Sequence, residues 1–323
     1  MRRSKKTCLP GMAGKCLSYL WTGGDAVKSR LMTTATLLVM AALLAASRQS
    51  AAAVAQGLRL CAETVVPALF PFLVFSALLV ELGGIASLAP PLQHLLGRLF
   101  GCSATGTGVF LLSLAGGYPM GPRLIAQLYA TGQLSRQEAE HLLLFCNNAG
   151  PAFILGLVGL GRFGSLRTGL ALWVIHMISA GLVALLLRPR QPFSAPELPP
   201  PQTPFAQALV HAIGAAGSTT VQLCAFVTFF CTLLQLAADR TGIAHPLVLG
   251  FVELTQGTLT LSATPTGFVM ASALLGWGGL SVHCQSAAVL AGPELSLRHY
   301  LPGKLLHSIL SSLFAAISLI FLF

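Results

Sequence analysis

Long apolar runs recur along this 323-residue chain and constrain its fold more than any other feature. Several extend over about 17 to 25 residues, long enough for a helix to cross a hydrocarbon core of roughly 30 Å. The short alternation of apolar and polar residues that is typical of membrane barrels does not accompany them. Only 9% of the residues are charged, whereas 54% are hydrophobic, so lipid is the expected main solvent. The sequence therefore predicts an all-α polytopic membrane protein.

The apolar runs predict about nine membrane segments. They lie near residues 31–47, 64–82, 106–128, 139–160, 168–187, 216–237, 243–262, 266–290 and 303–323. The first is interpreted as an extra, uncleaved N-terminal helix, although its composition also fits the core of a signal peptide.

The ends of these segments indicate how the chain is organised around the bilayer. Residues 1–30 hold a cluster of the chain's 19 basic side chains, which predicts a basic cytoplasmic tail close to anionic headgroups. No basic face interleaved with aromatic residues follows, so nucleic acid is not an expected partner. Residues 188–205 are rich in proline and predict an extended linker in water.

The two sides of the linker resemble each other. WVIHMISAGLVALLL at 173–187 matches KLLHSILSSLFAAIS at 304–318, and the same offset lays FCNNAGPAF onto GWGGLSVHC. Chance similarity between leucine-rich segments is the alternative explanation. We expect two copies of one unit, 48–187 and 206–323.

Four clusters of glycine, proline and amide residues interrupt the apolar segments. They are GGYPMGP at 116–122, NNAGP at 147–151, ELTQG at 253–257 and GWGG at 276–279. Broken helices expose backbone polar groups at membrane depth, and breaks that correspond between two repeats indicate a solute site near the midplane. The candidate substrate-binding residues are Gly117, Tyr118, Pro119, Asn147, Asn148, Glu253, Gln256, Ser281, His283 and Gln285.

The chain has only two asparagines, Asn147 and Asn148, and both lie in one of these clusters. Ser135 and Glu138 match a capping box, which predicts a helix that starts near Arg136 and is interrupted at Asn147. Pro151 suits the first turn of a second half-helix, with Asn148 near its cap. The two amides are expected either to bind a ligand or to cap and join neighbouring helices.

Glu253 is the acidic residue placed most clearly inside an apolar segment. Ionisable groups at that depth are functional candidates. We expect its side chain to face the interior near His283 or Gln285 and to couple a proton or hold a cation. The alternative is a position at the segment end, where it reaches the interface.

Other chemical signatures are missing from the sequence. The eight cysteines show no paired spacing, and His176 and His307 are interpreted as packing residues in apolar helices. No Ser/His/Asp arrangement, Walker loop or HExxH motif occurs. We expect no enzyme, no catalytic residue, no cofactor and no metal site.

Several stretches together resemble a known family. VPALFPFLVFSALLVELGG, SLAGGYPMGPRLIAQLYATGQLSRQEAEHLLLFCNNAGPAF, GFVELTQG and GLSVHCQSAAVL are similar to the sporulation integral membrane protein YlbJ family, within the nucleoside recognition, or Gate, domain group. The motif residues that this resemblance implies are Gly117, Pro119, Gly121, Asn147, Pro151, Glu253, Gly257, Gly279, Ser281 and Gln285. Cys146 departs from the family pattern, in which a hydroxyl residue is expected.

The resemblance implies a multi-pass protein of the cell (inner, cytoplasmic) membrane that is needed for forming the spore envelope or cortex. It also implies two Gate-like domains similar to parts of concentrative nucleoside transporters and ferrous iron permeases. The first functional hypothesis is a permease-like carrier of a small polar solute, nucleoside-like or other, through a site lined by broken helices. The alternative is a non-transporting membrane scaffold of the sporulation machinery, and an oligomer is left open in both cases.

Overall fold

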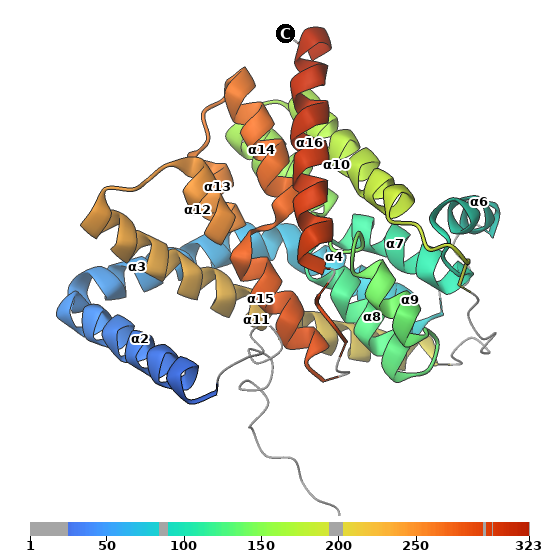
Figure 1. Ribbon diagram of the computed structural model, residues 1–323, viewed down its shortest axis with the longest axis horizontal. Coiled ribbons are helices and arrows are strands. Elements are labelled where there is room, and N and C mark those ends of the chain that lie inside the picture. The colour runs from blue at the N-terminus through green and yellow to red at the C-terminus, as the bar shows by residue number, and fades with distance from the viewer. Residues whose placement is uncertain (1–24, 84–89, 194–202, 293–294, 299, 323) are drawn as a thin grey trace, which may run out of the picture.

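The computed structural model describes residues 25–83, 90–193, 203–292, 295–298 and 300–322 (Figure 1). Regular secondary structure in these ranges is helical, without a strand, which confirms the predicted all-α class. In chain order the elements are α2 (Asp25–Ala45), α3 (Ser47–Leu60), the π-helical turn η1 (Cys61–Val65), α4 (Val66–Glu81), α6 (Pro90–Phe100), α7 (Ala104–Gly116), α8 (Met120–Ala130), α9 (Arg136–Leu142), the π-helical η2 (Ala152–Arg162), α10 (Leu166–Leu186), α11 (Phe205–Thr241), α12 (Pro246–Val252), α13 (Leu254–Thr260), α14 (Pro265–Trp277), α15 (Gly279–Leu290) and α16 (Tyr300–Leu322).

Five helical stretches are long and apolar enough to cross a membrane, which supports a multi-pass membrane protein. They are Ser47–Glu81, Leu166–Leu186, Phe205–Thr241, Pro265–Leu290 and Tyr300–Ile320. The expected nine segments are not confirmed. Three further apolar helices, Ser29–Ala45, Ala104–Gly116 and Ala152–Arg162, are shorter, because breaks in the chain divide the runs to which the last two belong.

The predicted basic tail and the predicted linker fall partly outside the described residues. The residues outside are 1–24 of the tail and 194–202 of the linker. The predicted first helix, 31–47, corresponds to α2, which begins at Asp25 and ends before a turn at Ala46.

Two long helices lie side by side and run in opposite directions. The α3–η1–α4 helix forms one of them and α11 the other (Figure 1). Cys61 Sγ lies 3.8 Å from the carbonyl oxygen of Cys224, and Glu81 Oε2 lies 3.7 Å from His211 Nδ1. The helices approach closely, since a Cβ atom added at Gly57 would lie 3.0 Å from Cα of Thr228.

The expected segment 243–262 does not cross as one helix, because the chain turns back at Glu253. A Cβ atom added at Gly257 would lie 2.1 Å from Cα of Gly250, seven positions earlier. Such an approach is impossible within one straight helix, in which seven residues rise about 10 Å. Helices α12 and α13 therefore form a short helical hairpin.

A second hairpin has the same form. A Cβ atom added at Gly121 in α8 would lie 3.2 Å from Cβ of Ser113 in α7, so the chain also turns back within the expected segment 106–128.

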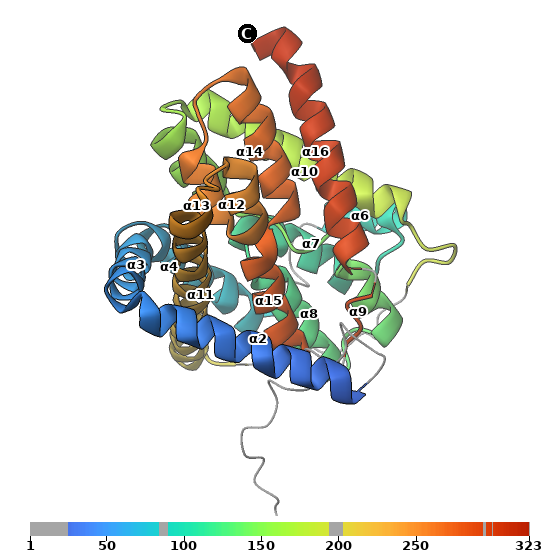
Figure 2. The same ribbon diagram turned by 60° about the vertical axis from the view of Figure 1, so that its left-hand side comes forward.

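The same order of elements occurs on both sides of the linker. A long helix is followed by a helical hairpin (α7–α8 or α12–α13), an interrupted helix (α9–η2 or α14–α15) and a closing helix (α10 or α16), with α6 added on the first side. Figure 2 shows α10, α14 and α16 together on one side of the molecule, above the two long helices. The duplication itself stays a prediction.

Candidate functional site

The chain is interrupted at all four positions where the sequence clusters lie. Helix α7 ends at Gly116 and α8 begins at Met120, and residues 146–150 are irregular before η2. Glu253 separates α12 from α13, and Gly278 separates α14 from α15. We call residues 117–119, 146–150, 253 and 278–279 the break cluster.

Direct contacts join these interruptions to one another. A Cβ atom added at Gly117 would lie 2.8 Å from the amide nitrogen of Gly150, and one added at Gly279 would lie 3.0 Å from that of Leu254. Both glycines also have positive φ angles, 74° and 83°. Both the close approach and the backbone conformation therefore favour glycine at these turns. Tyr118 Oη donates to the carbonyl of Leu275 at 2.7 Å and links the two pairs.

A small cavity of about 40 Å³ lies where the interruptions meet the long helices. Its lining includes Tyr118, Gly150, Phe153, Glu253, Leu254, Thr255, Val282 and Gln285, together with Val65, Leu69, Leu223 and Val227 from the long helices. One water molecule occupies about 30 Å³, whereas sites for drug-sized ligands enclose roughly 300 Å³ or more. In this conformation the cavity has room for water or a small ion and is far too small for a ligand of that size.

Glu253 lines this cavity and is 1% exposed. Its Oε2 atom accepts from the backbone N–H of Gln256 at 2.7 Å, so the side chain caps α13. Cys231 Sγ lies 3.8 Å from the same oxygen. Gln285 shares the cavity with Glu253, whereas His283 is not part of its lining.

A larger cleft of about 690 Å³ lies beside the α12–α13 hairpin. It is bounded by α3, α11 and α13, and Cys231 and Gln256 belong to its lining. These two residues also contact Glu253, so they lie between the open cleft and the inner cavity. Gln256 Oε1 has no hydrogen-bond partner among the described residues.

Asn147 lies in a buried polar network with Tyr300 at the start of α16. Its Nδ2 atom donates to Ser286 Oγ at 2.9 Å and to Tyr300 Oη. Tyr300 Oη also lies 2.9 Å from Nδ1 of His283. Oδ1 of Asn147, Oγ of Ser281 and Oε1 of Gln285 are buried without a partner among the described residues.

Asn148 caps a different helix from the one predicted. Its Nδ2 atom donates to the carbonyl of Phe145 at 2.8 Å and to Ser113 Oγ at 3.1 Å. It therefore closes the end of the preceding helical run, while the following half-helix, η2, starts directly after Pro151.

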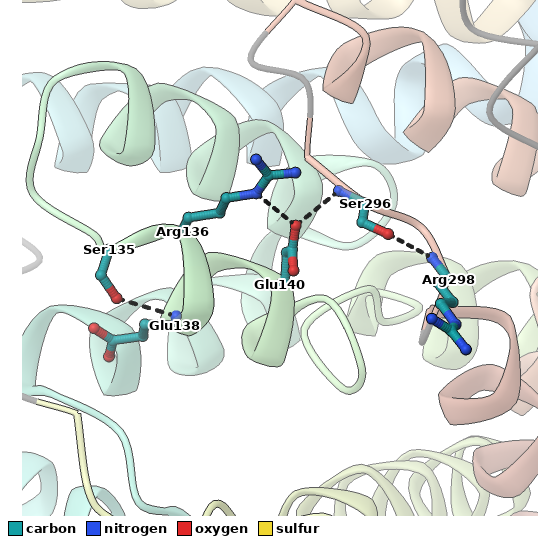
Figure 3. A network of polar contacts seen from close by, with 6 residues as sticks. All are labelled: Ser135, Arg136, Glu138, Glu140, Ser296 and Arg298. Carbon is teal, nitrogen blue, oxygen red and sulfur yellow. Dashed lines mark hydrogen bonds and ion pairs between the residues drawn. The ribbon is translucent and has the colours of Figure 1, made fainter.

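The predicted start of α9 is confirmed, but the reciprocal half of its capping box is wrong. Ser135 Oγ accepts from the N–H of Glu138 at 3.2 Å, as expected (Figure 3). The carboxylate of Glu138 instead accepts from the N–H of Ser103 at 2.8 Å, and so caps α7. Glu140 Oε1 accepts from Arg136 Nε at 3.0 Å and from the N–H of Ser296 at 3.1 Å, which ties α9 to the segment before α16 (Figure 3).

Lys304, which is fully buried in α16, was not among the predicted site residues. Its Nζ atom donates to the carbonyl of Asn147 at 2.8 Å and lies 5.4 Å from the ring centroid of Tyr118. No carboxylate of the described residues lies within 4.0 Å of it. A lysine among the apolar residues of KLLHSIL was the available signal.

His176 and His307 lie against each other, with ring centroids 4.4 Å apart. His176 Nε2 accepts from the N–H of Ala149 at 3.1 Å, and His307 Nε2 donates to the carbonyl of His176 at 3.1 Å. The histidines therefore fasten the irregular segment 146–150 to α10 and α16.

Comparisons with known proteins give one informative similarity. No protein-family model matches the chain, and no solved structure does. The sporulation integral membrane protein YlbJ of Bacillus subtilis (strain 168) is 25% identical over 334 residues, which cover 89% of this chain and 82% of that protein. The chain is thus similar to YlbJ over most of its length, and this similarity supports the predicted resemblance to the YlbJ family.

Proposed function

We propose that this chain is a carrier, not an enzyme, that moves a small polar solute across the cytoplasmic membrane through the break cluster. The observation that carries the proposal is that four helix interruptions, two from each side of the linker, contact one another, and that three of them line one cavity. The fourth, at 278–279, contacts Tyr118 and Leu254 of that lining. The name of the relative YlbJ supports a role in sporulation, and we propose that this role lies in forming the spore envelope or cortex. We place the N-terminus on the cytoplasmic side because of the basic residues that precede α2.

Unpartnered polar atoms next to the interruptions support a ligand at this place. Buried acceptors without a partner cost about 1–3 kcal/mol each, and Asn147 Oδ1, Asn148 Oδ1 and Gln285 Oε1 are such atoms among the described residues. A solute that donates hydrogen bonds would remove part of this cost. The amides of Asn147 and Asn148 are therefore proposed to contact the solute, as is Gln285.

The two cavities indicate how a solute would reach the site. The inner cavity of about 40 Å³ is too small for a nucleoside-sized molecule, whereas the cleft of about 690 Å³ is large enough. We propose that the structure is a closed conformation, and that movement of the α12–α13 hairpin joins the two spaces. Glu253 lies at the tip of this hairpin and would move with it.

The second candidate function is a membrane scaffold of the sporulation machinery that does not transport. Its support is the close packing of the interruptions, since backbone at Gly117 and Gly150 is already in contact. Such packing also stabilises a protein that never opens.

A ligand screen separates the two functions. The purified full chain is melted in the presence of nucleosides, bases, dicarboxylates and divalent metals, because a ligand that binds only the folded protein raises its melting temperature. We expect one of these classes to stabilise the wild type. Asn147→Leu should lose that stabilisation at a similar level of folded protein, whereas Gln133→Leu, which changes a partly exposed amide outside the break cluster, should keep it.

The opposite results have distinct meanings. If no solute stabilises the wild type and both variants still support sporulation, the scaffold function replaces the carrier. If a solute stabilises Asn147→Leu as strongly as the wild type, the solute binds outside the break cluster.

A further inference from the structure

We propose that the side chain of Lys304 is a built-in cation of the break cluster, which fills a cation position at residues 146–150 that would otherwise take a free ion. The inference rests on the proposed function only in treating these interruptions as the site. It adds that this position binds no alkali ion in the native chain, because the chain supplies the positive charge itself.

The acceptor of Lys304 lies at the end of a helical run. Backbone hydrogen bonds continue beyond α9, from the N–H groups of Leu144, Phe145 and Cys146 to carbonyls one turn earlier. Asn147 follows directly, and Lys304 Nζ donates to its carbonyl at 2.8 Å. The end of a helix carries a partial negative charge from its last carbonyls, which favours a cation there.

A second element approaches the same amine. Tyr118, in the turn between α7 and α8, places its ring centroid 5.4 Å from Nζ. The face of an aromatic ring attracts a cation. The amine of α16 therefore touches the turn of one hairpin and the interruption of the neighbouring segment.

Among the residues that the structure describes, no carboxylate lies within ion-pair distance of this amine. The titratable groups around Lys304 are Tyr118, Tyr300, His283, His176 and His307, from α7–α8, α15, α10 and its own helix. Glu253, the acid of the inner cavity, contacts Gln256 and Cys231 instead. A buried ammonium is costly unless its surroundings are polarised to accept it, and here a carbonyl and a ring face provide that polarisation.

The same geometry explains why an ion would otherwise bind. In carriers with interrupted helices, freed carbonyls and the C-terminal ends of half-helices coordinate the coupling cation. An ammonium group carries the same single charge as an alkali ion and has three donors. One of them is used by Asn147.

The test shortens the side chain of Lys304 and adds a small cation with the structure of the deleted part to the solution. Lys304→Ala leaves a space that matches n-propylammonium, whereas Lys304→Met removes the charge but keeps the volume. Each purified protein is melted in propylammonium chloride, sodium chloride, choline chloride and 1-propanol. At about ten times the dissociation constant, a bound cation should raise the melting temperature of Lys304→Ala by roughly 3 °C.

We expect this rise with propylammonium, but not with choline or with neutral 1-propanol. The wild type and Lys304→Met should not respond, nor should Arg298→Ala, which removes an exposed cation near the start of α16. Lys304→Met should also melt below the wild type, because the carbonyl of Asn147 loses its donor.

Three results would overturn the inference. One is a folded Lys304→Ala that is indifferent to cations, or is stabilised equally by 1-propanol. Another is a larger rise in melting temperature with sodium chloride for the wild type than for Lys304→Ala. The third applies if Lys304→Ala does not fold, and it is a Lys304→Met variant that melts at the same temperature as the wild type. None of these measurements uses a transported solute, so they are independent of the ligand screen.

Discussion

Two buried charged side chains, Glu253 and Lys304, lie in the break cluster or contact it. Glu253 caps α13 at the turn of a hairpin, and Lys304 reaches the end of another helical run. Each side chain binds backbone groups that a continuous helix would satisfy internally. At the scale of the residue, these two ionisable side chains therefore satisfy backbone groups at the interruptions.

We predict that Glu253→Gln folds but changes coupling. The amide oxygen of glutamine still accepts from the N–H of Gln256, so the melting temperature should stay within a few degrees of the wild type. Any dependence of solute binding on pH or on cations should weaken. The measurement is the shift in melting temperature caused by the solute between about pH 6 and pH 8.

Glu140→Gln is the matched control, because Glu140 lies outside the break cluster and pairs with Arg136. If solute binding by Glu253→Gln depends on pH as strongly as solute binding by the wild type does, Glu253 is assigned to helix capping alone.

At the scale of the element, local chemistry predicted where the helices stop but not where the chain goes next. Clusters such as NNAGP combine several residues that disfavour the interior of a helix, so the interruptions could be predicted from the sequence alone. The reversal of the chain at Glu253 could not be predicted in this way, because an apolar run has the same pattern whether it crosses the bilayer or folds back.

Long-range contacts explain the remaining errors. The carboxylate of Glu138 binds Ser103 instead of completing its local cap, and the burial of Lys304 depends on Asn147 and Tyr118. Partners so distant in the chain are not readable from spacing. The backbone of residues 146–150 likewise depends on His176, through Ala149.

The α12–α13 hairpin requires glycine at position 257. A Cβ atom there would lie 2.1 Å from Cα of Gly250, so Gly257→Ala must force the two helices apart. We predict a loss of about 1–3 kcal/mol in the free energy of unfolding. Gly214→Ala in α11 is the control, since no described atom outside the helix's own neighbouring backbone lies within 4 Å of its added Cβ.

Thermal melts of both glycine variants provide the measurement. Alanine is the better helix former by roughly 0.5–1 kcal/mol, so Gly214→Ala should melt at or above the wild-type temperature. Equal melting temperatures for the two variants would show that α12 and α13 do not pack in this way.

At the scale of the whole molecule, the arrangement favours two related halves. The long helices α3–α4 and α11 run antiparallel, and His176 contacts His307, its match in the sequence comparison. Contact between matching positions is what a two-fold relation between the halves would produce. The pseudo-two-fold axis stays a prediction, and its expected place is near this histidine pair.

An experimental structure of the full chain in lipid nanodiscs tests the central claim most directly. We predict helices interrupted at 117–119, 146–150, 253 and 278, with all four interruptions in contact and away from lipid. Density for Lys304 should reach the carbonyl of Asn147, and a two-fold rotation should superpose 206–323 on 48–187. Continuous helices through these positions, or interruptions that face lipid far from one another, would contradict the account.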